Sequence, residues 1–350
     1  MDKKTELIID KLHSDRSLTE EEYAYLIEHR DEESTCRLAS LAVAAREQVY
    51  GRDVFIRGLI EISNYCKNDC FYCGIRRSNK DCERYRLGED EILRCCEEGY
   101  DLGFRTFVLQ GGEDAFYTDE RLCGIIRTIK ERFPECAVTL SLGERSKESY
   151  RRLYEAGADR YLLRHETADE KHYASLHPSE LTLENRMRCL KDLQEIGYQT
   201  GCGFMVGSPG QTVKELAKDL RWIETFKPAM CGIGPFIPHK ATRYADMKPG
   251  SVELTCYLLS VIRLIQPNIL LPATTALATL DDKGQEKGIL AGANVIMPNL
   301  SPMEARSKYR LYDNKAYSGT EAAQNVEDLK RRMEEIGYKV VTNRGDIKGN

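Results

Sequence analysis

The chain has 350 residues, which suits one large domain or two ordinary ones and leaves room for a substantial core. Hydrophobic residues make up 41% and charged residues 31%, a balance that excludes an intrinsically disordered protein. The 51 Lys and Arg residues against 56 Asp and Glu residues give a formal net charge of −5. This charge argues against a nucleic-acid-binding protein.

The amino-terminal region is charged throughout and lacks the apolar stretch of a signal peptide. The longest uncharged stretches, such as residues 196–213, contain Gly, Gln, Thr and a proline and do not suit a membrane span. We therefore expect a cytoplasmic protein with no membrane and no nucleic-acid partner. Disulfides are rare in that compartment, so the 13 cysteines are expected to be buried free thiols unless they are closely spaced.

In chain order, residues 1–50 predict helices, because apolar residues recur there at helical spacing. After Gly51, short β-rich runs alternate with amphipathic helical segments. The β-rich runs cover residues 54–63, 106–114, 137–144, 158–167, 199–207, 230–238, 268–276 and 293–299. Helices are expected near residues 89–102, 119–132, 147–156, 251–265, 283–291 and 320–336, and from Thr182 and Thr212 onward.

Eight β/α units across about 250 residues predict an α/β protein with a (β/α)8 TIM barrel. A doubly wound open sheet shares the alternation, but no GxGxxG follows the first run. Nearly every run also ends in polar residues, which a barrel would gather on one face. We expect an N-terminal helical extension over residues 1–50, the barrel over residues 51–300 and a C-terminal covering segment over residues 301–350.

Three closely spaced cysteines follow the first run: Cys66, Cys70 and Cys73, in a C-x3-C-x2-C pattern. A structural zinc normally takes four protein ligands, and no nearby Cys or His pair completes such a site. Cys82, nine residues further on, lies in no recognisable ligand loop. Thiolates favour iron–sulfur clusters, and three cysteines can hold three irons of a cubane. The fourth iron would then be open to a small chelating ligand, such as the amine and carboxylate of an amino acid.

A C-x3-C-x2-C loop after the first strand of a β/α barrel resembles the radical S-adenosylmethionine (SAM) superfamily. The resemblance implies an enzyme with one [4Fe-4S] cluster, whose electron cleaves SAM to give a 5′-deoxyadenosyl radical. It places an aromatic residue near the adenine, a Gly-Gly-Glu element at the SAM amino group, an acid at the ribose and an arginine near the carboxylate. The implied SAM residues are Tyr72, Gly111, Gly112, Glu113, Ser141, Glu166 and Arg186.

The motifs VLQGGED (108–114), RHET (164–167), GPFIPH (234–239) and PATTA (272–276) occur in this order. Together they resemble the HydE family, the radical SAM maturases of [FeFe]-hydrogenase. The resemblance implies a small organometallic substrate, an iron centre with CO, cyanide and cysteine ligands, whose cysteine sulfur the radical attacks. It implies companion hydrogenase maturases and an electron donor such as flavodoxin or ferredoxin as partners. The implied substrate residues are Gln110, Thr139, Arg164, Thr274, Thr275 and Tyr309.

Some family members hold an auxiliary cluster with extra cysteines after the eighth strand. Here the last cysteine is Cys256, so we expect no auxiliary cluster. In the RHET motif, strand alternation places Arg164 and Glu166 on one face and His165 on the other. A structural ion pair remains the alternative to a ligand site there.

The roles of His239 and Tyr312 stay open, since either side chain could serve packing alone. The competing enzyme hypothesis is a methylornithine synthase-like or biotin synthase-like radical SAM enzyme, acting on a small amino acid or a sulfur-containing substrate. A non-catalytic iron–sulfur or zinc sensor is the hypothesis from another class. The GGED and RHET motifs at strand ends argue against it, because a sensor needs no SAM site.

Overall fold

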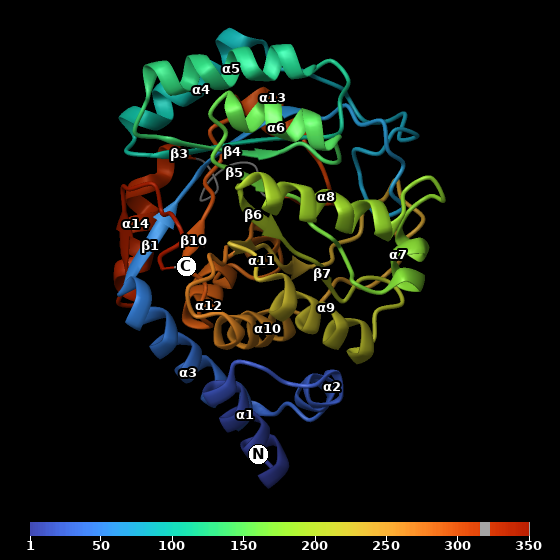
Figure 1. The fold of residues 1–350 in the computed structure, drawn as a ribbon, viewed down its shortest axis with the longest axis vertical. Coiled ribbons are helices and arrows are strands. Elements are labelled where there is room, and N and C mark those ends of the chain that lie inside the picture. Colours follow the sequence, from blue (N-terminus) through green and yellow to red (C-terminus); the bar gives the residue numbers. More distant parts are fainter. Residues whose placement is uncertain (316–322, 350) are drawn as a thin grey trace.

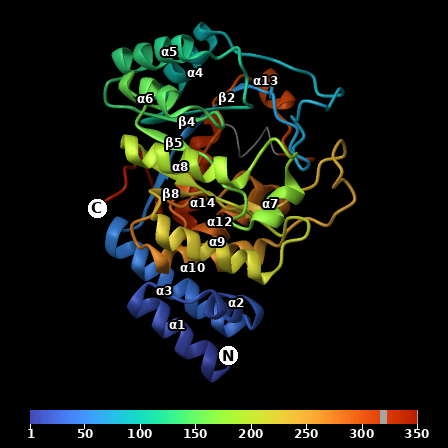
Figure 2. The ribbon, with the colours of Figure 1, turned by 45° about the vertical axis from the view of Figure 1, so that its right-hand side comes forward.

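The computed structural model describes residues 1–315 and 323–349. Its strands run parallel and form a ring, with most of the helices outside it (Figures 1 and 2). The barrel strands are β1 (Asp53–Ile56), β2 (Gly58–Ser63), β3 (Thr106–Gly111), β4 (Ala137–Ser141), β5 (Arg160–Leu162), β6 (Gln199–Cys202), β7 (Met205–Val206), β8 (Met230–Cys231), β9 (Gly234–Pro235) and β10 (Val295–Ile296).

Backbone pairing closes the ring. One six-stranded sheet has the order β2-β3-β4-β5-β6-β8. Leu270 then bridges Met230 of β8, and Pro272 bridges Val295 of β10. Strand β10 pairs with β1, which leads back to β2. The predicted eight-stranded α/β barrel is therefore confirmed, and an open doubly wound sheet is excluded.

The helices follow the predicted order. Their bounds are α1 (Lys3–Asp15), α2 (Glu20–Glu28), α3 (Glu32–Tyr50), α4 (Glu89–Asp101), α5 (Asp119–Arg132), α6 (Lys147–Glu155), α7 (Glu170–Leu176), α8 (Leu183–Ile196), α9 (Val213–Phe226), α10 (Val252–Ile265), α11 (Thr275–Leu280), α12 (Gly284–Leu290), α13 (Met303–Lys308) and α14 (Val326–Glu335). Of the helix expected near residues 320–336, residues 320–322 lie outside the described residues.

The β-rich runs are less regular than predicted. The seventh run, residues 268–276, makes only isolated bridges, and its last residues begin helix α11 at Thr275. The fifth and sixth runs each break at a glycine. A Cβ on Gly203, where φ is +156°, would lie 2.0 Å from the carbonyl oxygen of Gly232, so these two strands approach too closely for any side chain there. The short helices α7 and α13 were not predicted, because six or seven residues hardly show a helical period.

The first three helices pack on the outside of the barrel. Helix α2 lies against α9 and helix α3 lies against α10. The Tyr23 hydroxyl donates to Glu224 at 2.8 Å, and the Tyr257 hydroxyl donates to the carbonyl of Leu26 at 2.9 Å. The capping box between Thr19 and Glu22 starts helix α2. The exact division of the chain at residues 50 and 300 stays a prediction.

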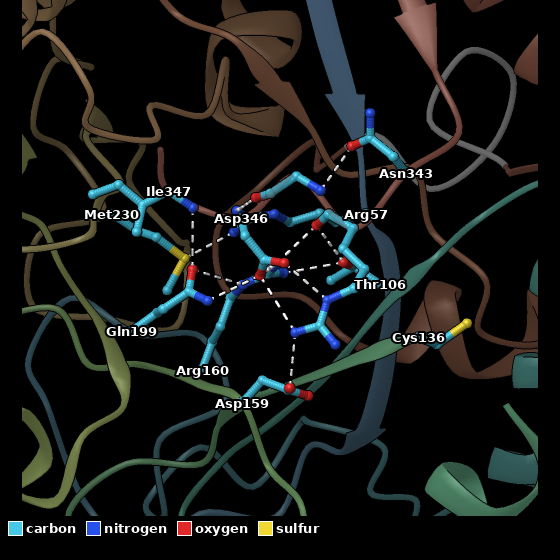
Figure 3. Close-up of polar contacts among 12 residues, drawn as sticks. Arg57, Thr106, Cys136, Asp159, Arg160, Gln199, Met230, Asn343, Asp346 and Ile347 are labelled. Carbon is cyan, nitrogen blue, oxygen red and sulfur yellow. Dashed lines mark hydrogen bonds and ion pairs between the residues drawn. The ribbon is translucent and has the colours of Figure 1, made fainter. Parts of the chain in front are cut away.

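The C-terminal segment fills the amino-terminal end of the barrel. Strand β11 (Lys339–Val341) pairs with β1, and the tail after it brings Asp346 and Ile347 among the polar side chains of the barrel strands (Figure 3). Arg160, the first residue of β5, donates to Asp346 at 2.5 Å and to the carbonyl of Arg344 at 2.7 Å. Gln199, the first residue of β6, donates to Asp346 at 2.9 Å. The tail thus forms the floor of the barrel, and it also lines a separate surface pocket there.

None of the helices in residues 1–315 and 323–349 is long and apolar enough to cross a membrane. All 13 cysteines are free thiols, and Cys36 is exposed. Most of them are buried, and the three cysteines of the C-x3-C-x2-C pattern are partly exposed.

Candidate functional site

A cavity of about 340 Å³ opens at the carboxyl ends of the barrel strands. The strand ends, the loop after β2 and the segment 309–315 form its wall. Predicted residues that line it are Cys66, Cys70, Tyr72, Cys73, Gln110, Gly111, Gly112, Glu113, Ser141, Arg164, Glu166, Arg186, Thr274, Thr275, Tyr309 and Tyr312. The barrel thereby joins residues from seven chain regions in one cavity.

The cysteine loop is fixed to the barrel by backbone hydrogen bonds. The Lys67 amide donates to the carbonyl of Glu113 at 2.9 Å, and the Phe71 amide donates to that of Leu176 at 2.9 Å. The Gly74 amide donates to the carbonyl of Leu311 at 2.8 Å, which ties the loop to the segment 309–315. Burial raises the pKa of all three thiols, so a cation is needed to hold them as thiolates.

The three thiols line one cavity, which allows them to share one cluster. Within the described ranges, no three His, Cys, Asp or Glu side chains have the spacing of a single-ion site. A cubane binds each thiolate through a different iron, so its ligands stand further apart than those of one zinc ion. Cys66, Cys70 and Cys73 all line one cavity with polar side chains beside them, and they therefore fit a [4Fe-4S] cluster.

Gly112 allows the cysteine loop to lie against the end of β3. A Cβ at this position would lie 2.2 Å from the carbonyl oxygen of Tyr65 and 2.8 Å from the Cβ of Cys66. We expect Gly112→Ala to displace the loop and to lower the iron bound after reconstitution several-fold, as measured by iron analysis and by the visible absorbance of the cluster. The matched control is Gly124→Ala on helix α5, where a Cβ meets nothing within 4 Å. Full iron content in Gly112→Ala would contradict this account.

Acidic and basic side chains next to the cysteines form a connected network. The Glu113 carboxylate accepts the Glu144 amide at 2.9 Å and pairs with the Lys67 ammonium at 3.1 Å. The Arg186 guanidinium donates to Glu144 at 2.5 Å and to the carbonyl of Arg164 at 2.5 Å. Glu144 holds Arg186 in place, although the sequence did not single it out as a site residue. The network contains a carboxylate, Glu113, that would face the amine of an amino acid. It also contains a guanidinium, Arg186, that would face the carboxylate.

The RHET motif divides between two environments, and this predicted division is confirmed. Arg164 and Glu166 form an ion pair at 3.0 Å on the cavity side. His165 points the other way and contacts Asp219 of helix α9 at 3.2 Å. Burial lowers the pKa of His165 to about 3, so this histidine is neutral and structural. Glu166 has a φ of 65°, a left-handed conformation that is unusual for a side-chain-bearing residue and marks a constrained position.

Around the outer part of the cavity, Gln110 donates to the Tyr309 hydroxyl at 3.5 Å. Thr139 is buried beneath the wall instead of lining it, which differs from the other predicted substrate residues. His239 also lies outside the wall and faces Asp313 at 3.8 Å, where it supports the segment 309–315. The Tyr72 hydroxyl lies 3.4 Å from His177, which orients its ring at the cavity edge.

Comparison with known proteins shows to which family the chain is related. The family model described as the Radical SAM superfamily matches residues 60–223. The [FeFe] hydrogenase maturase subunit HydE of Thermotoga maritima is 43% identical over 88% of this chain and 87% of its own length. The chain belongs to the HydE family. It is a radical SAM enzyme, and its family implies a [4Fe-4S] cluster and SAM.

Other relatives of this HydE-family chain share the barrel. A 3-methylornithine synthase of Methanosarcina barkeri is 27% identical over 94% of this chain and 92% of its own length. The crystal structure of methylornithine synthase (PylB) has a TM-score of 0.83 at 26% identity, covering 95% of this chain and 97% of that chain. The crystal structure of HydG, described as a maturase of the [FeFe]-hydrogenase, has a TM-score of 0.77 at 22% identity, covering 96% and 75%, and shows the fold alone.

Membership in the HydE family decides between enzyme and sensor, because a radical SAM enzyme uses SAM at its cluster. Two charged cavity residues escaped the sequence analysis: Glu61 of β2 and Lys315 of the covering segment. The sequence could have indicated Glu61, because it is a charged residue in a strand whose other residues are Gly, Leu, Ile and Ser. The sequence gives no such indication for Lys315, because a lysine in a polar C-terminal segment is ordinary. The roles predicted for individual SAM and substrate residues remain proposals.

Proposed function

We propose that this enzyme matures the active site of [FeFe]-hydrogenase by acting on a small organometallic precursor, an iron centre with two CO ligands, cyanide and cysteine. The observation that carries the proposal is 43% identity to HydE along 88% of the chain. When bound, the cluster and SAM supply a 5′-deoxyadenosyl radical, and the proposed target is the cysteine sulfur of the precursor.

In this proposal the chain's own residues bind, orient and exclude water. Cys66, Cys70 and Cys73 hold the cluster, and the network around Glu113 and Arg186 receives the amino-acid end of SAM. Arg164 suits an anionic ligand, because its guanidinium offers two parallel donors and its Nε has no hydrogen-bond partner in the described part of the chain. The floor of the barrel limits solvent entry from the opposite end.

The proposed partners are companion hydrogenase maturases, one of which delivers the precursor, and an electron donor such as flavodoxin or ferredoxin. A cytoplasmic location is proposed with them. We also propose a single cluster. Iron analysis of the reconstituted protein should therefore give about four irons per chain, and about eight would reveal an auxiliary cluster.

The test is a substrate panel with the reconstituted holoenzyme, SAM and reductant. The precursor complex should stimulate formation of methionine and 5′-deoxyadenosine and should be consumed with them. Lysine and dethiobiotin should not stimulate SAM cleavage. Conversion of lysine to a rearranged amino acid would overturn the proposal in favour of a methylornithine synthase-like activity, which the 27% identity to 3-methylornithine synthase makes the second candidate.

A further inference from the structure

The outer wall of the cavity holds a buried carboxylate that no step of the proposed function uses. Glu61 of β2 is fully buried and lines the cavity. Its Oε1 accepts from the ammonium of Lys315. Its Oε2 is buried and has no hydrogen-bond partner within residues 1–315 and 323–349. A buried carboxylate with a free oxygen is costly, and a donor from a ligand would remove that cost.

The position of Glu61 places it among the predicted substrate residues. It is the register partner of Gln110 on the neighbouring strand β3. Gln110 contacts the Tyr309 hydroxyl, and the Tyr309 carbonyl accepts from Lys315 at 3.1 Å. The Lys315 ammonium also lies 4.6 Å from the centre of the Tyr309 ring. Glu61 and Lys315 therefore lie beside the predicted substrate residues Gln110 and Tyr309, in the part of the cavity wall that we call the substrate wall.

Four charged side chains of the cavity have buried atoms without a hydrogen-bond partner in the described residues: Glu61, Glu113, Arg164 and Glu166. The free oxygens of Glu113 and Glu166 are ion-paired with Lys67 and with the Nη2 of Arg164, which leaves the Oε2 of Glu61 and the Nε of Arg164. An acceptor on one wall and a donor on another match a ligand with an amino group and a carboxylate. This pattern suits an α-amino-acid moiety better than a purely anionic or apolar ligand.

We propose that Glu61 accepts the amino N–H of the substrate's amino-acid moiety at Oε2, and that Lys315, paired at Oε1, competes with this amino group for the charge of the carboxylate. Lys315 is a suitable exchangeable partner, because it comes from the covering segment 309–315 and not from a barrel strand. That segment is held at its other end by Leu311 and Asp313, whose backbone groups bond to Gly74 and Pro238. Glu61 is thus a positioning residue that selects for the amino group. The inference rests on the proposed function only in that the substrate carries an amino-acid part.

The test compares two ligands that differ by the amino group, L-cysteine and 3-mercaptopropionate. Both are titrated into the holoenzyme with SAM bound and without reductant, and binding is measured by calorimetry. Wild-type protein should bind L-cysteine at least about 10-fold more tightly. Glu61→Gln should weaken L-cysteine binding about 10- to 100-fold and leave 3-mercaptopropionate binding nearly unchanged, as expected for the loss of one charged hydrogen bond. The matched control is Glu304→Gln, an exposed acid that pairs with Lys308 on helix α13.

A second variant separates selection from simple structural support. Lys315→Met removes the competitor and leaves Glu61 unpaired, so it should tighten L-cysteine binding several-fold, opposite in sign to Glu61→Gln. Its melting temperature should fall without ligand and recover with L-cysteine. If both variants weaken binding alike, or if wild-type protein binds the two ligands equally or binds neither, the inference is wrong. Failure of the precursor to stimulate SAM cleavage, with selective L-cysteine binding retained, would overturn the proposed function alone.

Discussion

Replacing Cys70 with alanine is expected to remove cluster-dependent SAM cleavage. Three thiolates are the minimum that holds three irons of a cubane, and the loop that carries them lines the cavity. With only two cysteines left, a second iron of the cubane would lose its protein ligand. Anaerobic reconstitution of Cys70→Ala should give far fewer than the about four irons expected for the wild type. Production of 5′-deoxyadenosine under reducing conditions should fall below detection.

Cys82→Ala is the matched control for this prediction. Cys82 is also a partly exposed cysteine close in sequence, but its sulfur lies 3.6 Å from the Asn64 side-chain nitrogen and it does not line the cavity. This variant should keep its iron and its SAM cleavage. Loss of iron in Cys82→Ala but not in Cys70→Ala would contradict the ligand assignment. A stoichiometry near one zinc with no SAM cleavage in wild-type protein would contradict the cluster itself.

Replacing Asp346 with alanine is expected to lower the stability of the fold. Arg160 is fully buried and pairs with Asp346, so the variant leaves a buried guanidinium without its carboxylate (Figure 3). Removing one partner of a buried ion pair is strongly destabilising. We expect a loss of roughly 3 kcal/mol, the low end for such pairs, because Asp346 keeps partial contact with water. Denaturant unfolding at pH 7 measures it, with Glu335→Ala, in an ion pair exposed on both sides, as the control.

The contribution of Asp346 should depend on pH. Burial alone would raise the pKa of Asp346, but the charge of Arg160 and hydrogen bonds from Gln199 and Arg344 hold the pKa well below its ordinary value. A carboxyl group with a depressed folded-state pKa stabilises the fold above its unfolded pKa of about 3.9, and this stabilisation is lost as pH falls further. The difference in unfolding free energy between wild type and Asp346→Ala should therefore be constant from pH 7 to about pH 5 and shrink below about pH 4. A difference that grows on acidification would contradict this assignment.

Much of the fold could be predicted from the periodicity of apolar residues in the sequence. The β/α alternation predicted the barrel and most helix positions, because buried strands and amphipathic helices leave distinct patterns. The seventh run failed as a strand, since its PATTA residues begin helix α11. Only isolated backbone bridges, from Leu270 to Met230 and from Pro272 to Val295, hold this run between β8 and β10. The closure of the ring there depends on partners that lie far away in the sequence, and local pattern says nothing about them.

The cysteine spacing and the strand-end motifs were enough to determine the class of chemistry and the family. The formal net charge of −5 argued against a nucleic-acid partner. The cysteine pattern and the motifs lie within single short segments, so the sequence carries them complete. Only the tertiary structure brought Glu144 to Arg186, Lys315 to Glu61 and Asp346 to Arg160. The members of the last two pairs are 254 and 186 residues apart, and each pair forms because barrel closure buries one charge beside the other. Which charges share a buried space is a property of the folded chain, and that decided the substrate wall and the floor of this barrel.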